Sequence, residues 1–415
     1  MPKFTVTLKQ HTPLIHFQAE QEGATLRATE LKPKLDKFLI KNVFKDDFDK
    51  YKEFLIGYPN KTEKKDFGDT FPLDYKIKIF NQINRKTENI ERTKINKNGK
   101  RVSDNFPLFF ANTGVKDYEK KVFVYCDTLD IEFTSLFNDK LISSIQYYFP
   151  KFLMENNFGT RQSKGFGSFF INDNNEYYYN GFKKEYDTDY INDIKRLNYM
   201  FSVYVKSNNK YDIYKDVFKK IELFYKSMRS GLDYNKVDPI IKDYFYGKRI
   251  TWDKEAIKLK YKNKCTDELL KSKNVMLVKD LFGLSLKEKW KQNNNYEWII
   301  TKKHLCKDKD EERDKIERFK SPIFFKPIQI SRNKYNIYFG AVPINEELLG
   351  QEFSIKNNDK DEFILKTPDK FDFHDFFQFC FEKSSYSKGI KLEREAKETK
   401  EVKSIYSDIK KNLND

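Results

Sequence analysis

The sequence lacks the features that mark membrane, secreted and metal-binding proteins. It contains no run of about 18 uncharged apolar residues, the length that a membrane-spanning helix needs, and it begins MPKFTVTLKQ, without an apolar signal core. The histidines are scattered, and no two cysteines form a CxxC pair; the cysteines are Cys126, Cys265, Cys306 and Cys380. A disulfide framework and a zinc site are therefore not indicated. We expect a reduced, cytoplasmic protein with no metal, no cofactor and no membrane partner.

Apolar residues are also scarce. They make up 39% of the 415 residues, below the roughly 45–50% of an average globular chain. An aromatic content of 16% offsets this shortage, because Phe and Tyr side chains bury large areas. The chain is therefore able to form sizeable cores, and its length predicts two or three domains of about 150 residues each.

Basic residues exceed acidic ones, with 79 Lys and Arg against 63 Asp and Glu, which gives a net charge of +16. An excess of this size indicates a polyanionic partner, most often a nucleic acid. The alternative is a solvated surface that is simply rich in lysine.

The first half of the chain shows alternating and helical patterns in an informative order. Alternation predicts a half-buried strand over residues 4–8, and apolar residues at helical spacing predict helices over 29–56 and 139–154. Further strands are expected at 73–80, 108–111, 121–126, 130–133 and 169–171, and a polar hairpin or loop at 81–105. Without the extra hairpin, this order fits a split βαβ, ferredoxin-like unit.

The second half repeats the mixture of strands and helices. Strands are expected at 199–205, 323–330, 335–339, 353–355 and 363–365, with helices at 215–228, 238–290 and 371–381. We therefore predict an α+β fold of two ferredoxin-like (RRM-like) domains. The first spans residues 1–190 and the second 191–387, with a helical insertion at about 233–315. Residues 388–415 form a charged tail, either a solvated helix or a flexible end.

The most specific motif is a glycine-rich loop after the helix predicted at 139–154. It contains Gly159, Arg161, Lys164, Gly165, Phe166, Gly167 and Ser168. Glycines allow positive φ and close approach to a ligand, and consecutive loop N–H groups are able to cup an anion. Two cations and a possible stacking ring suit a single-stranded RNA site. The spacing fits neither a Walker A loop nor a Rossmann loop, and the alternative is a plain glycine-rich turn.

A second basic motif, GATLRATELKPK, leads into the helix predicted at residue 29. The free N–H groups and the dipole of a helix start favour phosphate, and Arg27, Lys32 and Lys34 add cations on the same side. In a ferredoxin-like fold the ends of the first and last strands lie near one another. We therefore expect the glycine loop close to this helix start, although each cation taken singly is equally well an ordinary surface residue.

A third motif, RFKSPIFFKPI at residues 318–328, predicts a buried strand framed by prolines. Its primary role is expected to be structural. Lys326 lies within the apolar run, where it requires a partner, either a carboxylate or a phosphate.

Evidence for catalysis is weak. His16 follows the first strand and is the first candidate for a general base in RNA cleavage, but no second histidine pairs with it in the sequence. A lone histidine is more often structural. Cys380 lies in an aromatic helix, FFQFCF, and is expected to be a buried, inert thiol.

Taken together, these motifs resemble the RAMP superfamily of CRISPR proteins, and most closely subunit one of the type III-B Cmr effector complex. The likeness rests on TPLIHFQ…GATLRATELKPKLDKFL, on NNFGTRQSKGFGSF and on RFKSPIFFKPI. The G-x-R-x(2–4)-G-x-G-S loop of that superfamily is met by Gly159, Arg161, Gly165, Gly167 and Ser168. The resemblance covers residues 1–57, 140–172 and 318–342.

The resemblance implies a non-catalytic RNA-binding subunit with two ferredoxin-like domains. Its partners would be the crRNA, the target RNA and other Cmr subunits, and it would help to capture target RNA near the 3′ end of the crRNA in antiviral defence. The RNA-binding residues would come from the glycine loop, from Arg27, Lys32 and Lys34, and from Lys326. The alternatives are a metal-independent RAMP endoribonuclease that processes CRISPR RNA, and a scaffold that binds only protein.

Overall fold

The computed structural model divides the chain into two compact units. Unit 1 contains residues 1–105, 119–198 and 325–338, and unit 2 contains residues 106–118, 199–324 and 339–415. The structure describes residues 1–15, 25–89, 93–95, 99–103, 106, 122–173, 197–232, 238–262, 266, 273–293, 296–305, 316, 319–344, 346–357, 362–383 and 397–414. The strand expected at 108–111 and the candidate base His16 lie outside these residues.

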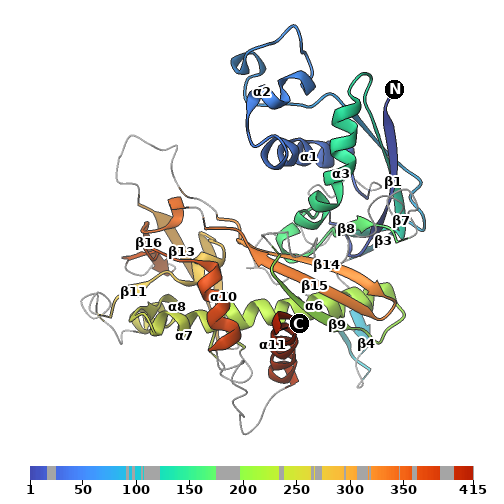
Figure 1. The fold of residues 1–415 in the computed structure, drawn as a ribbon. Coiled ribbons are helices and arrows are strands. Elements are labelled where there is room, and N and C mark those ends of the chain that lie inside the picture. The colour runs from blue at the N-terminus through green and yellow to red at the C-terminus, as the bar shows by residue number, and fades with distance from the viewer. Residues whose placement is uncertain are drawn as a thin grey trace. The chain divides into compact units, whose positions relative to one another are not determined.

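Unit 1 is built on a four-stranded antiparallel sheet with two helices on one side (Figure 1). The elements follow as β1 (Lys3–Gln10), α1 (Ala28–Asn42), β2 (Lys76–Phe80), β7 (Thr128–Thr134), α3 (Asp139–Glu155) and β8 (Phe169–Ile171). The strand order is β2-β7-β1-β8. This order and these directions are those of a split βαβ unit, so the topology expected for the first half is confirmed.

The core of unit 1 follows from the period of the apolar residues. In β1, Phe4, Val6 and Leu8 are buried while Lys3 and Thr5 are exposed, because successive strand side chains point to opposite faces. The helices cover the buried face, and their apolar stripes meet where the Phe38 and Phe152 rings lie 5.5 Å apart; the stripes contain Leu31, Leu35, Phe38 and Leu39 in α1, and Leu141, Ile145, Phe149 and Phe152 in α3.

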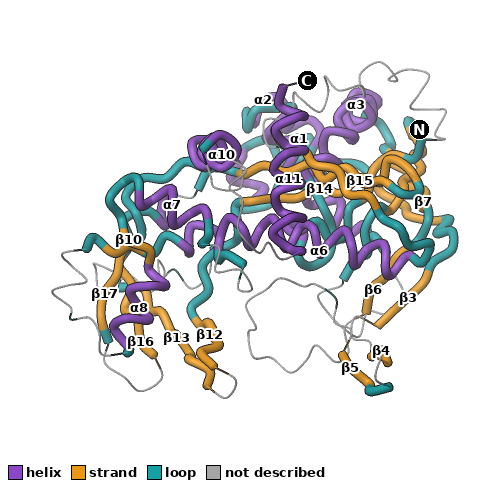
Figure 2. The backbone as a smooth tube through the Cα atoms, turned by 90° about the horizontal axis from the view of Figure 1, so that it is seen from below, coloured by secondary structure: helices purple, strands orange, loops and turns teal. Residues whose placement is uncertain are grey.

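The helix expected over residues 29–56 is shorter than predicted. It ends at Asn42, because Lys45 and Asp46 take positive φ values of 59° and 58°. Two short helical segments follow, α2 (Phe48–Tyr51) and η1 (Lys52–Phe54), and then η2 (Lys64–Phe67). The polar region at 81–105 contributes to two small ribbons (Figure 2), β3 (Lys86–Asn89) with β6 (Val122–Tyr125), and β4 (Thr93–Ile95) with β5 (Arg101–Ser103).

Unit 2 contains a six-stranded sheet with the order β10-β11-β17-β16-β13-β12. Its strands are β10 (Thr251–Trp252), β11 (Val275–Met276), β12 (Lys287–Asn293), β13 (Tyr296–His304), β16 (Glu352–Asn357) and β17 (Phe363–Lys366). A separate three-stranded sheet has the order β14-β15-β9, formed by β14 (Ile323–Ser331), β15 (Lys334–Ala341) and β9 (Tyr199–Tyr204). Residues 325–338 of β14 and β15 belong to unit 1 as defined above. The larger sheet does not have ferredoxin-like strand order, so the coarser α+β description holds for unit 2.

The helical insertion expected at 233–315 is a mixture of helix and strand. Only α7 (Ile240–Tyr246) and α8 (Asp253–Tyr261) are α-helices among its described residues, and β10, β11, β12 and β13 also lie there. The prediction of helix over 238–290 is therefore wrong in its second part. The pattern is obscured because β12 and β13 direct charged side chains inward: Glu288 and Lys302 are buried.

The charged tail contains a helix that packs into unit 2. Helix α11 (Lys397–Asn414) buries Val402, Ile405, Tyr406 and Ile409, which recur at helical spacing. It contacts β9 and α6 (Lys210–Arg229), as Figure 1 also shows. Asp408 accepts a hydrogen bond from the Ser202 amide at 2.5 Å. The described part of the tail is thus neither a solvated helix nor a flexible end.

Unit 2 also encloses a network of buried charges. Lys302 donates to Asp280 at 2.6 and 2.7 Å and to Glu288 at 3.0 Å, and Lys279 also pairs with Glu288. Asp253 is buried beside this network, and burial followed by the Asp280 charge raises its pKa to about 6. Partners of both signs are present, as buried charges require.

Candidate nucleic-acid interface

The glycine loop connects α3 to β8 and is fastened to the segment that follows β1. The Thr160 amide donates to the Ile15 carbonyl at 2.7 Å, and the Gly167 amide donates to the Pro13 carbonyl at 2.9 Å. The Thr12 hydroxyl donates to the Gly165 carbonyl at 2.6 Å and accepts from the Ser168 amide at 2.9 Å. The Thr-Pro turn and the glycine loop therefore form one structure.

Three glycines of the loop occupy backbone conformations that L-residues rarely adopt. The φ values are 76° for Gly159, 93° for Gly165 and 65° for Gly167. A Cβ atom on Gly159 would lie 2.6 Å from the Ile15 carbonyl oxygen, and one on Gly167 would overlap the Phe158 carbonyl. Gly159 and Gly167 are required because other backbone passes close to them.

Glu30 joins the loop to the first turn of α1. Its Oε1 atom accepts hydrogen bonds from the Gly159 amide at 2.8 Å, from Gln162 Nε2 at 3.2 Å and from Lys34 Nζ at 2.9 Å. The predicted proximity of the glycine loop and the helix start is thereby confirmed. Sequence reasoning missed Glu30, because an acidic residue in the first turn of a helix is common and suits the helix dipole.

The loop uses many of its own N–H groups internally. Six of them donate to atoms of this chain; they belong to Gly159, Thr160, Lys164, Gly165, Gly167 and Ser168. The anion held by the Gly159 amide is the Glu30 carboxylate. The expected cup of backbone donors for a bound phosphate is therefore largely filled by the protein itself.

The lysines of the helix start are held by protein partners. Lys32 pairs with Asp36 at 2.7 Å and lies 4.2 Å from the centre of the Tyr75 ring. Lys34, besides its bond to Glu30, donates to the Asn157 carbonyl at 3.0 Å. Burial lowers the pKa of Lys34, an effect that the neighbouring Glu30 opposes. Both lysines thus help to fix α1, although each remains partly exposed.

The remaining predicted site residues divide into two sets by burial. Arg27 and Arg161 are half-buried. Lys164 is 3% exposed and Phe166 is fully buried. The Phe166 ring stacks on Phe123, with 6.2 Å between centroids and 22° between planes. Phe166 therefore has a protein partner where base stacking was expected.

Lys326 is fully buried beneath the loop. In place of the expected carboxylate or phosphate, it donates to two backbone carbonyls, Asn156 at 2.9 Å and Phe169 at 3.0 Å. Burial, and then the charge of Lys34, lower its pKa well below the ordinary lysine value. Ser168 makes a second link to the same strand, donating its hydroxyl to the Pro327 carbonyl at 2.8 Å. Both residues support the loop from within.

Among the residues that the structure describes, no three His, Cys, Asp or Glu side chains converge to hold a metal ion. No helix in the described ranges has both the length and the apolar character to span a bilayer.

Two family models together match nearly the whole chain. The Cmr1 N-terminal domain matches residues 1–232 and the Cmr1 C-terminal domain matches residues 236–410. The chain belongs to the Cmr1 family. The predicted resemblance to subunit one of the Cmr complex is thus confirmed, and the glycine loop described above lies within the Cmr1 N-terminal domain. No curated protein matches the sequence.

Solved structures that match this Cmr1-family chain have low sequence identity and low TM-scores. The apo crystal structure of Cmr1 from Pyrococcus furiosus is 10% identical, with a TM-score of 0.35, and the match covers 83% of this chain and 90% of that one. A chain in the cryo-EM structure of the type III-B Cmr-beta bound to cognate target RNA is 13% identical, with a TM-score of 0.36 and coverage of 81% and 94%.

Proposed function

We propose that this protein is a non-catalytic, RNA-binding subunit of a type III-B Cmr effector complex and captures target RNA near the 3′ end of the crRNA. Membership of the Cmr1 family along the chain carries this proposal. The net charge of +16 supports a polyanionic partner, and structures matched by this chain include the Cmr-beta bound to cognate target RNA.

In this proposal the half-buried arginines bind RNA and the buried residues support the loop. Arg27 and Arg161 bind phosphate oxygens at the junction of α1 and the glycine loop, since both are partly open to solvent. Arginine is suited to this role because its planar fork matches phosphate oxygens. The buried residues Lys164, Phe166 and Lys326 hold the loop in place.

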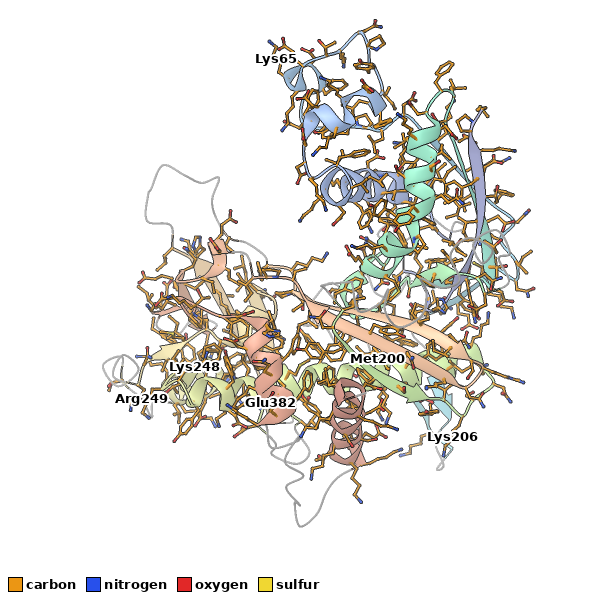
Figure 3. All side chains as sticks on the ribbon, viewed as in Figure 1. Lys65, Met200, Lys206, Lys248, Arg249 and Glu382 are labelled. Carbon is orange, nitrogen blue, oxygen red and sulfur yellow. The ribbon has the colours of Figure 1, made fainter. Side chains whose placement is uncertain are left out.

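The first test compares two arginines in the same backbone conformation. Arg161 and Arg249 both have φ of 60°, and asparagine tolerates this region, so Arg161→Asn and Arg249→Asn each remove one charge without new strain. Arg249 lies in unit 2 (Figure 3) and serves as the control. Binding of a labelled single-stranded RNA by the full chain is measured at several salt concentrations.

We expect Arg161→Asn to flatten the slope of log K against log salt by about 0.7, the contribution of one phosphate contact on a single strand. Arg249→Asn should leave the slope unchanged. An equal effect of both variants would contradict a localised site. RNA cleavage without metal that disappears in His16→Ala would contradict the non-catalytic assignment.

The position on the guide requires the assembled complex. A photoreactive nucleotide near the 3′ end of the crRNA or in the paired target should cross-link to this chain, whereas one in the 5′ tag should not. Cross-linking only from the 5′ tag would contradict the proposed position.

A further inference from the structure

Helix α1 carries a row of lysines that the glycine loop does not use. Lys37 and Lys41 follow Lys34 at three and seven residues, a spacing that places all three on one face of the helix. Lys45 follows the end of the helix by three residues. Lys37, Lys41 and Lys45, which we term the lysine stripe, are exposed to solvent.

The lysine stripe differs from neighbouring lysines because its side chains have no partner among the residues that the structure describes. Within the described residues, Lys37, Lys41 and Lys45 make no ion pair, side-chain hydrogen bond or contact with an aromatic ring. Neighbouring lysines are paired, Lys50 with Asp47 and Lys52 with Asp49. Exposed lysines readily form such pairs with nearby carboxylates, so at the stripe the described part of the chain supplies cations without compensating anions.

No carboxylate on α1 neutralises the stripe. Glu30 is engaged by Lys34 and the glycine loop, and Asp36 lies on the buried side, paired with Lys32. Two exposed acidic residues, Asp46 and Asp47, directly follow Lys45 in the sequence. The lysine stripe is therefore followed by acidic residues beyond Lys45.

The geometry connects the stripe to the glycine loop. Lys34, on the same helix face, donates to the Asn157 carbonyl two residues before Gly159. From there, Lys37 and Lys41 lie about 6 Å apart along the axis at 1.5 Å per residue. Lys34, Lys37 and Lys41 thus lead away from the loop along one face of the helix, and Lys45 follows beyond its end. This arrangement suits an extended polyanion rather than a single small anion.

Stabilisation of the helix dipole does not explain the whole stripe. Cations favour the last turn of a helix, and Lys41 lies in that turn. Lys37 lies near the middle of α1, where the dipole effect has faded. A ligand outside the chain accounts for all three positions.

We propose that the lysine stripe is a phosphate-binding track that carries the backbone of single-stranded RNA along α1, away from the glycine loop. This inference rests on the proposed RNA-binding function and specifies the surface along which the bound RNA runs. Lysine acts as a point charge on phosphate and does not read base edges. The track therefore binds RNA without regard to sequence, as capture of varied targets requires.

The test compares two triple variants of equal charge change in the full chain. The stripe variant is Lys37→Gln/Lys41→Gln/Lys45→Gln, and glutamine is a good helix former. The control is Lys50→Gln/Lys61→Gln/Lys65→Gln, three exposed lysines of the same unit. They lie in and around the α2–η2 segment, where Figure 3 labels Lys65. Far-UV circular dichroism and urea midpoints verify that all proteins are folded.

Binding of labelled polyuridylate is measured between about 50 and 200 mM salt. Three phosphate contacts contribute about 0.7 each, so the stripe variant should flatten the slope of log K against log salt by about 2. Over this fourfold range of salt, the wild type should lose roughly 18 times more affinity than the variant. The control should keep the wild-type slope, and Lys→Arg at the three stripe positions should also keep it.

Each contrary outcome has its own meaning. Equal flattening in both triple variants would overturn the track and leave only diffuse attraction by net charge. An unchanged slope in the stripe variant would overturn it while the RNA-binding function stands. An unchanged slope with lost binding of purified Cmr subunits would instead assign the stripe to an acidic protein surface. Failure of the wild type to bind RNA, alone and in the assembled complex, would refute the proposed function itself.

Discussion

Replacing Gly167 by alanine should destabilise unit 1 by about 2–5 kcal/mol. Part of this cost is the left-handed backbone, with φ of 65°, which costs an L-residue roughly 1–2 kcal/mol. The rest is steric, since the new Cβ atom would overlap the Phe158 carbonyl and push the two segments apart. That separation weakens the bonds from the Phe158 amide to Gly167 and from the Gly167 amide to Pro13, at about 0.5–1.5 kcal/mol each.

Gly68 offers a comparison for this prediction. Its φ is 64° and its ψ is −140°, a backbone conformation that L-residues rarely adopt, yet a Cβ atom there would meet nothing within 4 Å. Gly68→Ala should therefore cost only the backbone strain, roughly 1–3 kcal/mol. A larger cost at Gly167 then reports the close approach of the backbone in the glycine loop.

Hydrogen exchange followed by mass spectrometry is the suitable assay, because a chain of two units need not unfold in one step. Protection of the β1 and β8 amides reports on unit 1 alone, and urea midpoints provide an independent comparison. If Gly167→Ala costs no more than Gly68→Ala, the loop yields easily and the steric argument is wrong.

Three further changes test other parts of the structure. The pKa of Asp253 is raised to about 6, so its contribution to stability is complete below about pH 4 and is lost as the pH rises through 6. Asp253→Asn should remove this loss and raise the unfolding free energy at pH 8 by up to about 3 kcal/mol, with no gain at pH 4. Urea midpoints at the two pH values would show this difference. Ile409→Ala should lower the melting temperature through a cost of about 2–5 kcal/mol, whereas Leu413→Ala, at a site 49% exposed, should cost under about 1. Glu30→Ala should speed exchange of the Gly159 amide by weakening the loop by about 1–3 kcal/mol, and unchanged exchange would show that the carboxylate is dispensable.

Regular apolar patterns made much of unit 1 predictable. The helix expected at 139–154 occupies Asp139–Glu155, and the strand expected at 169–171 occupies the same residues. The helix gathers its buried apolar side chains at helical spacing, and the strand is a short apolar run, so both patterns are visible in the sequence. The same reasoning located β14, where six consecutive buried residues follow Pro322.

The buried charges of unit 2 explain why β12 and β13 were missed. Strand β13 buries Trp298, Ile300, Lys302 and His304 in alternation, yet two of these residues are polar. Burial in this strand therefore alternates along the chain, but hydrophobicity does not. The buried ion pairs that allow Lys302 to face inward become visible only when the partner strand β12 and the segment carrying Asp280 are placed beside it in the structure.

The location of the candidate site was predicted from the sequence, but the burial of its side chains was not. The expected topology placed the glycine loop at the start of α1, but a loop has no period to reveal which side chains point inward. Lys164 and Phe166 therefore looked as available as Arg161, although both are buried. The partners of Lys326 were also hidden, because backbone carbonyls leave no signal in the side-chain sequence.

The return of residues 325–338 to unit 1 has a consequence for how this protein is made. Lys326 and Pro327 bond to Asn156, Phe169 and Ser168, which precede them by more than 150 residues. At about 5–20 residues per second on the ribosome, the first unit waits roughly 8–30 s for the strand that completes it. During that interval the glycine loop lacks the contacts that Lys326 and Pro327 make with it and its flanking residues. A fragment ending at residue 232, the limit of the matched N-terminal domain, would never receive that strand.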